Sequence, residues 1–213
     1  MATLYGFFRS SAAFRVRIAL NLKKISYDTV SVHLRKGQHK TEEYLKLNPM
    51  SMVPFYVDDM VSVGQSLAII EYLEDRYPEP AILPSTYAGR ARVRAIAQMV
   101  ACDIHPLQNL RVMQYLEHNF KIDDEGTKTW AAHWIKTGFD ALEKLLASSP
   151  DTGIFCHGDT PTMADVYLFP QILNAHRFGL DVKQWRTIAR IEEACRKEEA
   201  FIRAMPENQS DAE

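Results

Sequence analysis

The sequence changes character at a proline-rich segment. Residues 78–84 read Pro-Glu-Pro-Ala-Ile-Leu-Pro, and this run cannot continue a helix because proline lacks a backbone N–H and fixes φ. Strand-like and helical patterns alternate before it, whereas only helical patterns follow it. The chain of 213 residues is long enough to bury two modest cores. We therefore expect an α/β domain over residues 1–82 and an all-helical domain over residues 87–213.

The first part of the chain predicts the element order βαβαββα. Strand patterns cover residues 3–7 and 26–34, and a hairpin is expected over residues 53–63. Helical patterns cover residues 12–24 and 41–47 and the stretch that opens at Gln65-Ser66. The spacing of apolar residues in these helices predicts that Arg15, Arg17, Lys23 and Glu74 face water.

The second part predicts a helical bundle. One long helical pattern covers residues 87–120 and bends at Pro106, and two more cover residues 127–147 and 162–178. A shorter helix is expected between Gln184 and Met205. Residues 206–213 are polar, and we expect them to be loosely held.

Charge and composition exclude several classes of function. A formal net charge of −2 removes the long-range attraction that a nucleic-acid or anionic-membrane surface needs. No run reaches the roughly 18 apolar residues of a membrane span, and the start does not read as a signal peptide, so we expect a cytoplasmic protein. Cys102, Cys156 and Cys195 are scattered and odd in number, which predicts neither a disulfide framework nor a metal site.

Two serines separate the first strand from the first helix. A helix start at Ser10-Ser11 offers free N–H groups and partial positive charge, both of which favour an anion. A bound thiol there would lose its proton more easily, and a serine hydroxyl can donate to the thiolate. The alternative is that both serines only cap the helix. Ala12 and Ala13 stand where a redox protein would carry a reactive cysteine, so exchange by the chain's own thiol is not expected.

Two further turns suit a peptide-like ligand. The proline of Val53-Pro54 can adopt the cis form, which would turn the N–H and C=O of Val53 outward for pairing; an ordinary edge proline is the alternative. Gln65-Ser66 opens a helix after a strand, which suits a ligand carboxylate, and a plain cap at Ser66 is the alternative. All three turns are expected on one side of one sheet.

These motifs resemble those of the glutathione transferases, and within them the zeta class, which includes maleylacetoacetate and maleylpyruvate isomerases. Residues 10–20 are similar to the class signature of two serines, an aromatic residue and Arg-Val-Arg-Ile-Ala-Leu, except that Ala12 replaces the signature cysteine. The resemblance continues through residues 47–49, 53–54, 65–73, 102–106 and 158–165. It implies the glutathione transferase fold, a thioredoxin-like βαβαββα domain followed by an all-helical domain.

The resemblance also implies glutathione as cofactor and a role for each matching residue. Ser10 would activate the thiolate, with Ser11 and Arg9 assisting, and Asp165 would form a capping box with Thr162 that serves folding. Tyr5 is expected in the core, and His39 taken alone would be a solvated loop histidine. Apart from the resemblance, the fork of a guanidinium suits substrate carboxylates, and Arg9, Arg111 and Arg177 are the candidates; a solvated surface role is the alternative for each. The residues expected to hold glutathione are Gln38, His39, Val53, Pro54, Gln65, Ser66, His105, Gln108 and Asn109.

The implied function is glutathione-dependent cis–trans isomerisation of a maleyl keto acid by reversible thiolate addition, in aromatic catabolism. Which of maleylacetoacetate and maleylpyruvate is the natural substrate stays open. A broader transferase that conjugates or dehalogenates small acids is one alternative, and an idle module that binds other proteins is another. Retention of Ser10, Val53-Pro54 and Gln65-Ser66 argues against the idle module. The resemblance further implies a homodimer.

Overall fold

The computed structural model describes residues 2–213, which divide into two units. The first unit runs to Ile82 and also takes in Arg196–Glu213, while the second is Leu83–Cys195. The sequence pattern predicts a single helical domain over the whole of residues 87–213. The end of the chain packs with the first unit instead, because its last α-helix lies against the first helix of the chain.

The first unit is built on a four-stranded sheet in the order β2-β1-β3-β4. β1 and β2 are parallel, whereas β3 is antiparallel to both β1 and β4. This is the predicted thioredoxin-like arrangement. Its elements are β1 (Ala2–Gly6), α1 (Ser11–Leu22), β2 (Tyr27–Ser31), a 3₁₀ turn (Gln38–Lys40), α2 (Glu42–Leu47), β3 (Phe55–Val57), β4 (Ser62–Gly64), α3 (Ser66–Arg76) and α9 (Glu199–Ala204).

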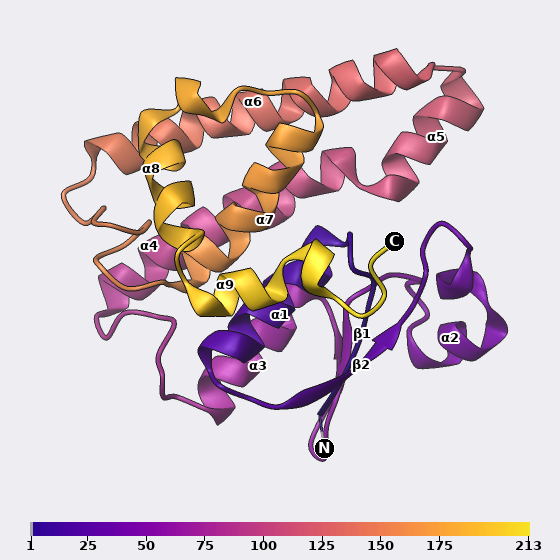
Figure 1. Cartoon of the computed structure of the whole chain (residues 1–213), viewed down its shortest axis with the longest axis horizontal. Coiled ribbons are helices and arrows are strands. Elements are labelled where there is room, and N and C mark those ends of the chain that lie inside the picture. Colours follow the sequence, from indigo (N-terminus) through magenta and orange to yellow (C-terminus); the bar gives the residue numbers. More distant parts are fainter. Residues whose placement is uncertain (1) are drawn as a thin grey trace. The chain divides into compact units, whose positions relative to one another are not determined.

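Alternation along β1 decides which helix covers which face of the sheet. Leu4 and Gly6 are buried on the α1 side, where a Cβ added to Gly6 would lie 3.3 Å from the Cβ of Ala13. Tyr5 points to the opposite face, where its ring centroid lies 6.4 Å from that of Tyr44 in α2. Accordingly, Figure 1 shows α1 and α3 on one side of the sheet and α2 on the other.

The prediction that the charged residues of α1 face water is wrong. Arg15 and Arg17 are 2% exposed and Lys23 is 4% exposed, because α1 packs against α3 and α9 as well as the sheet. The Lys23 ammonium lies 2.6 Å from the carboxylate of Glu74, which is also buried. The same ammonium donates to the carbonyls of Tyr77 and Pro80. Each buried charge thus has partners that a reading of one helix cannot supply.

The end of the chain is held and not loose. Arg17 Nε donates to the Ala204 carbonyl at 3.1 Å, and Asn21 Nδ2 donates to the Ala200 carbonyl at 2.9 Å, which fixes α9 to α1. Beyond α9, the carboxylates of Asp211 and Glu213 accept hydrogen bonds from residues near β1 and β2. The polar composition that suggested a loose tail instead supplies these acceptors.

The second unit is helical, as predicted, but two of the expected helices are divided. The pattern over residues 87–120 is interrupted by a π-helical turn (Met99–Ile104) and a 3₁₀ turn (His105–Gln108), around Pro106, which has no N–H to donate. The expected helix between Gln184 and Met205 is two helices, one in each unit. The α-helices of this unit are α4 (Tyr87–Gln98), α5 (Leu110–Phe120), α6 (Asp124–Ser148), α7 (Met163–Arg177) and α8 (Arg186–Cys195).

The predicted capping box at the start of α7 is present. The carboxylate of Asp165, which is fully buried, accepts from the N–H and the hydroxyl of Thr162, each at 2.8 Å, and from the Cys156 N–H at 2.8 Å. This arrangement satisfies donors that the helix start would otherwise leave unpaired. Within the described residues, none of the helices has the length and apolar character that crossing a membrane requires.

Candidate active site

Strand register brings the three predicted turns to one edge of the sheet. Gly6, which ends β1, is opposite Ser31 at the end of β2, and Tyr5 is opposite Phe55 at the start of β3. Phe55 is in turn opposite Gly64, which ends β4. The segments that leave or enter the sheet at this edge carry Ser10, Gln38, Val53 and Gln65-Ser66.

Ser10 is the N-cap of α1. Its backbone is extended, and its Oγ accepts from the Ala13 N–H at 3.2 Å, so the capping role is real. A hydroxyl that accepts one hydrogen bond still has its own O–H to donate, so capping does not exclude interaction with a ligand anion. Ser11 is the first helical residue and is 9% exposed.

Arg9 adds positive charge to the same turn. It is half-buried beside Ser10, and partial burial together with the charge of Arg35 lowers its pKa. A guanidinium in a protein keeps its charge at neutral pH. The helix start and this cation therefore both favour an anion near Ser10.

The main-chain N–H and C=O of Val53 form what we call the Val53 backbone edge. The peptide bond between Val53 and Pro54 is cis, which is one of the two forms that the sequence left open. Among the hydrogen bonds of residues 2–213, none uses the N–H or C=O of Val53. The preceding carbonyl, that of Met52, accepts from Tyr44 Oη and Asn48 Nδ2, both at 2.7 Å, which fixes this turn. The main chain of Val53 is thus held in place with its own polar groups available.

Gln65 and Ser66 form the start of α3. Gln65 has a φ of 70°, a conformation that costs a residue other than glycine about 1–3 kcal/mol and recurs at functional sites. Its side chain is exposed and does not cap the helix, so the first N–H groups of α3 have no side-chain cap. Ser66 is 7% exposed, and its Oγ accepts from Arg15 Nη1 at 3.4 Å. The result is a helix start with a buried cation beside it.

Gln38 and His39 lie on the 3₁₀ turn between β2 and α2. Gln38 Oε1 accepts from the His33 N–H at 2.6 Å, which orients the side chain and leaves the amide N–H groups to donate. His39 is not a solvated loop residue, because it is 9% exposed and its carbonyl accepts from Ser51 Oγ at 2.6 Å. Burial and the charge of Lys40 lower the pKa of His39, which favours the neutral form of its ring.

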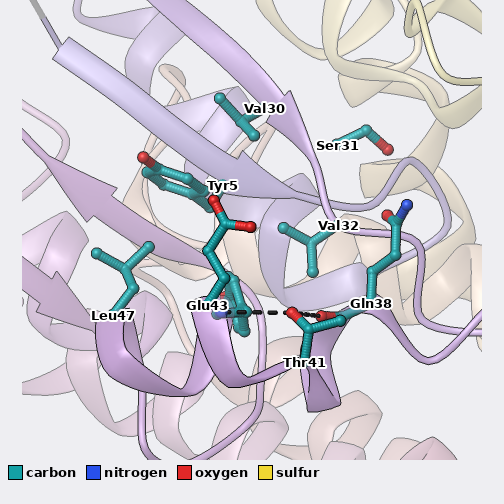
Figure 2. A pocket seen from close by; sticks show the side chains of 9 residues that line it. Tyr5, Val30, Ser31, Val32, Gln38, Thr41, Glu43 and Leu47 are labelled. Atoms are coloured by element: carbon teal, nitrogen blue, oxygen red, sulfur yellow. Dashed lines mark hydrogen bonds between the residues drawn. The ribbon is translucent and has the colours of Figure 1, made fainter.

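A cavity of about 390 Å³ lies between β2 and α2 (Figure 2). Tyr5 lines this cavity and packs against the cluster of Phe7, Phe8 and Val53, so it is only partly a core residue. The other lining residues are Val30, Ser31, Val32, Gln38, Thr41, Glu43, Tyr44 and Leu47.

The remaining predicted site residues belong to the second unit. His105 and Gln108 lie on the 3₁₀ turn, where Gln108 is buried and its Nε2 has no partner among the described residues. Asn109 is the N-cap of α5 and accepts from the Arg111 N–H at 3.2 Å. Arg111 is exposed, as is Arg177, which ends α7 with its guanidinium 5.5 Å from the Phe178 ring centroid.

Two features of the site were missed by sequence reasoning. Arg15 donates a hydrogen bond to Ser66 inside the first unit. Asp211 accepts a hydrogen bond from the N–H of Phe8, which lies 203 residues earlier in the sequence. The presence of an arginine on a largely apolar helix could have indicated that Arg15 is buried beside another element. No pattern in the sequence points to the second.

Comparison with known proteins places these features in a family. The chain matches the model of the glutathione S-transferase N-terminal domain over residues 4–81 and that of the C-terminal domain over residues 125–197. A maleylpyruvate isomerase from Ralstonia sp. is 46% identical, over 98% of this chain and 99% of the relative.

Solved structures support the same family assignment. A holo maleylpyruvate isomerase, named as a bacterial zeta-class glutathione S-transferase, is 45% identical with a TM-score of 0.96, covering 99% of this chain and 100% of its own. A maleylacetoacetate isomerase from Methylobacterium extorquens with bound malonate and glutathione is 39% identical with a TM-score of 0.96, covering 99% of each chain. The chain therefore belongs to the glutathione S-transferase family, within its zeta class.

Proposed function

We propose that the chain is a glutathione-dependent cis–trans isomerase that converts a maleyl keto acid, maleylacetoacetate or maleylpyruvate, to its fumaryl isomer. One observation carries the proposal: a serine-capped helix start, an unpaired Val53 backbone edge and the uncapped start of α3 occupy the same edge of one sheet. Relatives that match over nearly their whole length are named for these two reactions.

The turns of the first unit fit glutathione group by group. The uncapped N–H groups of α3 and the Ser66 hydroxyl suit the γ-glutamyl carboxylate, with Gln65 beside them. The N–H and C=O of Val53, held by the turn that includes Pro54, suit the peptide groups of the cysteinyl residue. Donors on Gln38 and His39 suit the glycine end. The three turns thus offer partners to the γ-glutamyl carboxylate, to the cysteinyl peptide groups and to the glycine end.

The chain's own contribution to the chemistry is to stabilise an anion. When bound, glutathione supplies a thiolate that can add reversibly to a double bond conjugated with a ketone, which allows that bond to rotate. Ser10 donates its O–H to the sulfur, while the start of α1, including the Ser11 N–H, contributes partial positive charge. Arg9 adds a full charge to the same turn.

The carboxylates of a maleyl keto acid match the planar fork of a guanidinium, so we assign substrate binding to arginines. Arg9 stands next to Ser10, and Arg111 and Arg177 are exposed on the second unit. We assign His105, Gln108 and Asn109 to glutathione, since the buried amide of Gln108 has a donor without a partner among the described residues. A buried unpaired donor is costly, and a ligand acceptor would satisfy it.

The test is a direct assay with each maleyl acid. Purified protein is incubated with maleylacetoacetate or maleylpyruvate, with and without glutathione, and the fumaryl product is separated by chromatography. Glutathione-dependent isomerisation of either acid supports the proposal. Release of chloride from a small haloacid without isomerisation would favour the broader transferase, and no turnover of any of them would favour the idle module.

We also propose a homodimer in the cytoplasm. Light scattering should report about twice the chain mass of 24.4 kDa, whereas a mass near 24.4 kDa contradicts the dimer. Cell fractionation tests the location.

A further inference from the structure

The peptide groups of Phe8 are held from both sides. Phe8 lies two residues before Ser10, and its N–H donates to Asp211 Oδ2 at 3.2 Å. Its carbonyl accepts from Arg17 Nη2 at 3.1 Å, and the Nε of the same guanidinium donates to Ala204 in α9. Burial lowers the pKa of Arg17 to about 10, which leaves it charged at neutral pH.

A second turn is held by the same end of the chain. Glu213 Oε1 accepts from His33 Nε2 at 2.9 Å and from Lys36 Nζ at 3.2 Å. His33 Nδ1 accepts from the Lys36 N–H at 3.1 Å, so the ring proton lies on Nε2 and is donated to Glu213. The His33 N–H in turn donates to Gln38 Oε1. This contact connects the end of the chain to a residue assigned to glutathione.

The segment that carries both carboxylates is anchored. Gln209 Nε2 donates to the carbonyls of Arg203 and Met205 at 3.0 and 2.8 Å, which fixes the chain just after α9. Asp211 Oδ2 accepts from Ser31 Oγ at 2.7 Å as well as from Phe8, so one oxygen joins the ends of β1 and β2. We call residues 209–213 the C-terminal clasp.

We propose that the C-terminal clasp positions the glutathione-binding turns, and that Asp211 is a positioning residue for glutathione. The inference rests on the proposed function, because it deepens the role of the same site. Asp211 holds the turn that leads to Ser10, and Glu213 holds the turn that leads to Gln38.

Side-chain packing connects the turn that leads to Ser10 with the turn that leads to Gln38. The Phe7 ring lies 4.7 Å from the Phe8 ring and 4.8 Å from the His33 ring, measured between centroids. Val53 belongs to the same buried cluster as Phe7 and Phe8. Release of the Phe8 N–H by Asp211 therefore loosens a cluster that supports both Ser10 and the Val53 backbone edge. A carboxylate makes stronger hydrogen bonds than a neutral acceptor, so removing its charge matters.

The first experiment measures the turns without any ligand. Amide hydrogen exchange is compared in the full-length parent, Asp211→Ala, Asp211→Glu and the control Glu207→Ala, which removes an exposed carboxylate next to the clasp. We expect Asp211→Ala to raise exchange in residues 6–12 by about tenfold, as the loss of one charged hydrogen bond implies, with Asp211→Glu intermediate. Exchange unchanged from the parent would overturn the proposal.

The second experiment measures glutathione affinity by calorimetry, together with KM and kcat on whichever maleyl acid is turned over. We expect Asp211→Ala to raise the Kd and KM for glutathione by about five- to tenfold, with kcat at saturation within about twofold of the parent. Glu207→Ala should match the parent in every measurement. Equal affinity in Asp211→Ala and a parent that binds glutathione contradicts this inference alone. A parent that binds no glutathione contradicts the proposed function itself.

Discussion

Arg15 Nη1 donates to the hydroxyl of Ser66 at 3.4 Å inside the first unit, and both side chains are buried. The contact joins α1 to the first turn of α3. It places a full positive charge beside a helix start that already carries partial positive charge. A carboxylate bound at this start is therefore stabilised by two independent sources.

Replacing Arg15 should weaken glutathione binding. We expect Arg15→Met to raise the Kd for glutathione by about tenfold, because a buried charge near a bound carboxylate contributes on the order of 1–2 kcal/mol. Calorimetry measures the change, with Lys46→Met, which removes an exposed cation of α2, as the control. A folded Arg15→Met variant with the parent's affinity would show that Ser66 and the helix start suffice.

Ser10 should matter for turnover and Tyr5 should not. We expect Ser10→Ala to lower kcat by about 10²-fold or more, the usual cost of removing a donor to a developing anion, with Tyr5→Phe near the parent. Steady-state kinetics on the maleyl acid measures both. Thr86→Ala is the matched control, since Thr86 caps α4 through the Gly89 N–H at 3.1 Å as Ser10 caps α1. That control should lose about 1 kcal/mol of stability and keep its turnover.

The buried pair of Lys23 and Glu74 should be fragile to single changes. Lys23→Met leaves the Glu74 carboxylate buried without its cation, so we expect the free energy of unfolding to fall by about 3–5 kcal/mol. Urea denaturation measures this loss. The double variant Lys23→Met with Glu74→Gln should recover much of it, and a double variant less stable than the single one would contradict this reading.

Asp58 should stabilise the first unit in a pH-dependent way. Burial alone would raise its pKa, but N–H groups of Met60 and Val61 and the hydroxyl of Tyr72 donate to the carboxylate, and the net effect is a lowered pKa. Its stabilisation is therefore full above the unfolded pKa of about 4 and is lost as pH falls through the lower folded value. We expect Asp58→Asn to lose about 1–3 kcal/mol at pH 7, and urea denaturation at falling pH should show this gap closing below about pH 4. A gap that stayed constant into acid would contradict the assignment.

The features that the sequence could predict are those formed by residues close together in the chain. Three such features were predicted: the cap at Ser10, the helix start at Ser66 and the capping box of Asp165. Each depends only on neighbours within a few residues, so the sequence is enough to indicate it. The βαβαββα order of residues 1–82 followed from the same local signals, whereas the packing of α9 with this unit did not.

Contacts between distant residues could not be predicted in this way. Lys23 is buried because Glu74, Tyr77 and Pro80 meet it from another part of the chain, and Asp211 reaches Phe8 across nearly the whole sequence. A helical pattern also continues across Pro106, although the backbone there changes to π and 3₁₀ geometry. For Lys23 and Asp211 the deciding partner is set by tertiary packing and not by spacing.

In the proposed function, this chain ionises the thiol of bound glutathione at a serine-capped helix start. The most direct measurement is a pH titration of thiolate ultraviolet absorbance in the protein–glutathione complex, with S-methylglutathione as the baseline. We expect an apparent pKa for the bound thiol below the ordinary value of about 8.5, and we expect it to return toward that value in Ser10→Ala. A complex that titrates like free glutathione, with or without the Ser10 hydroxyl, would contradict it.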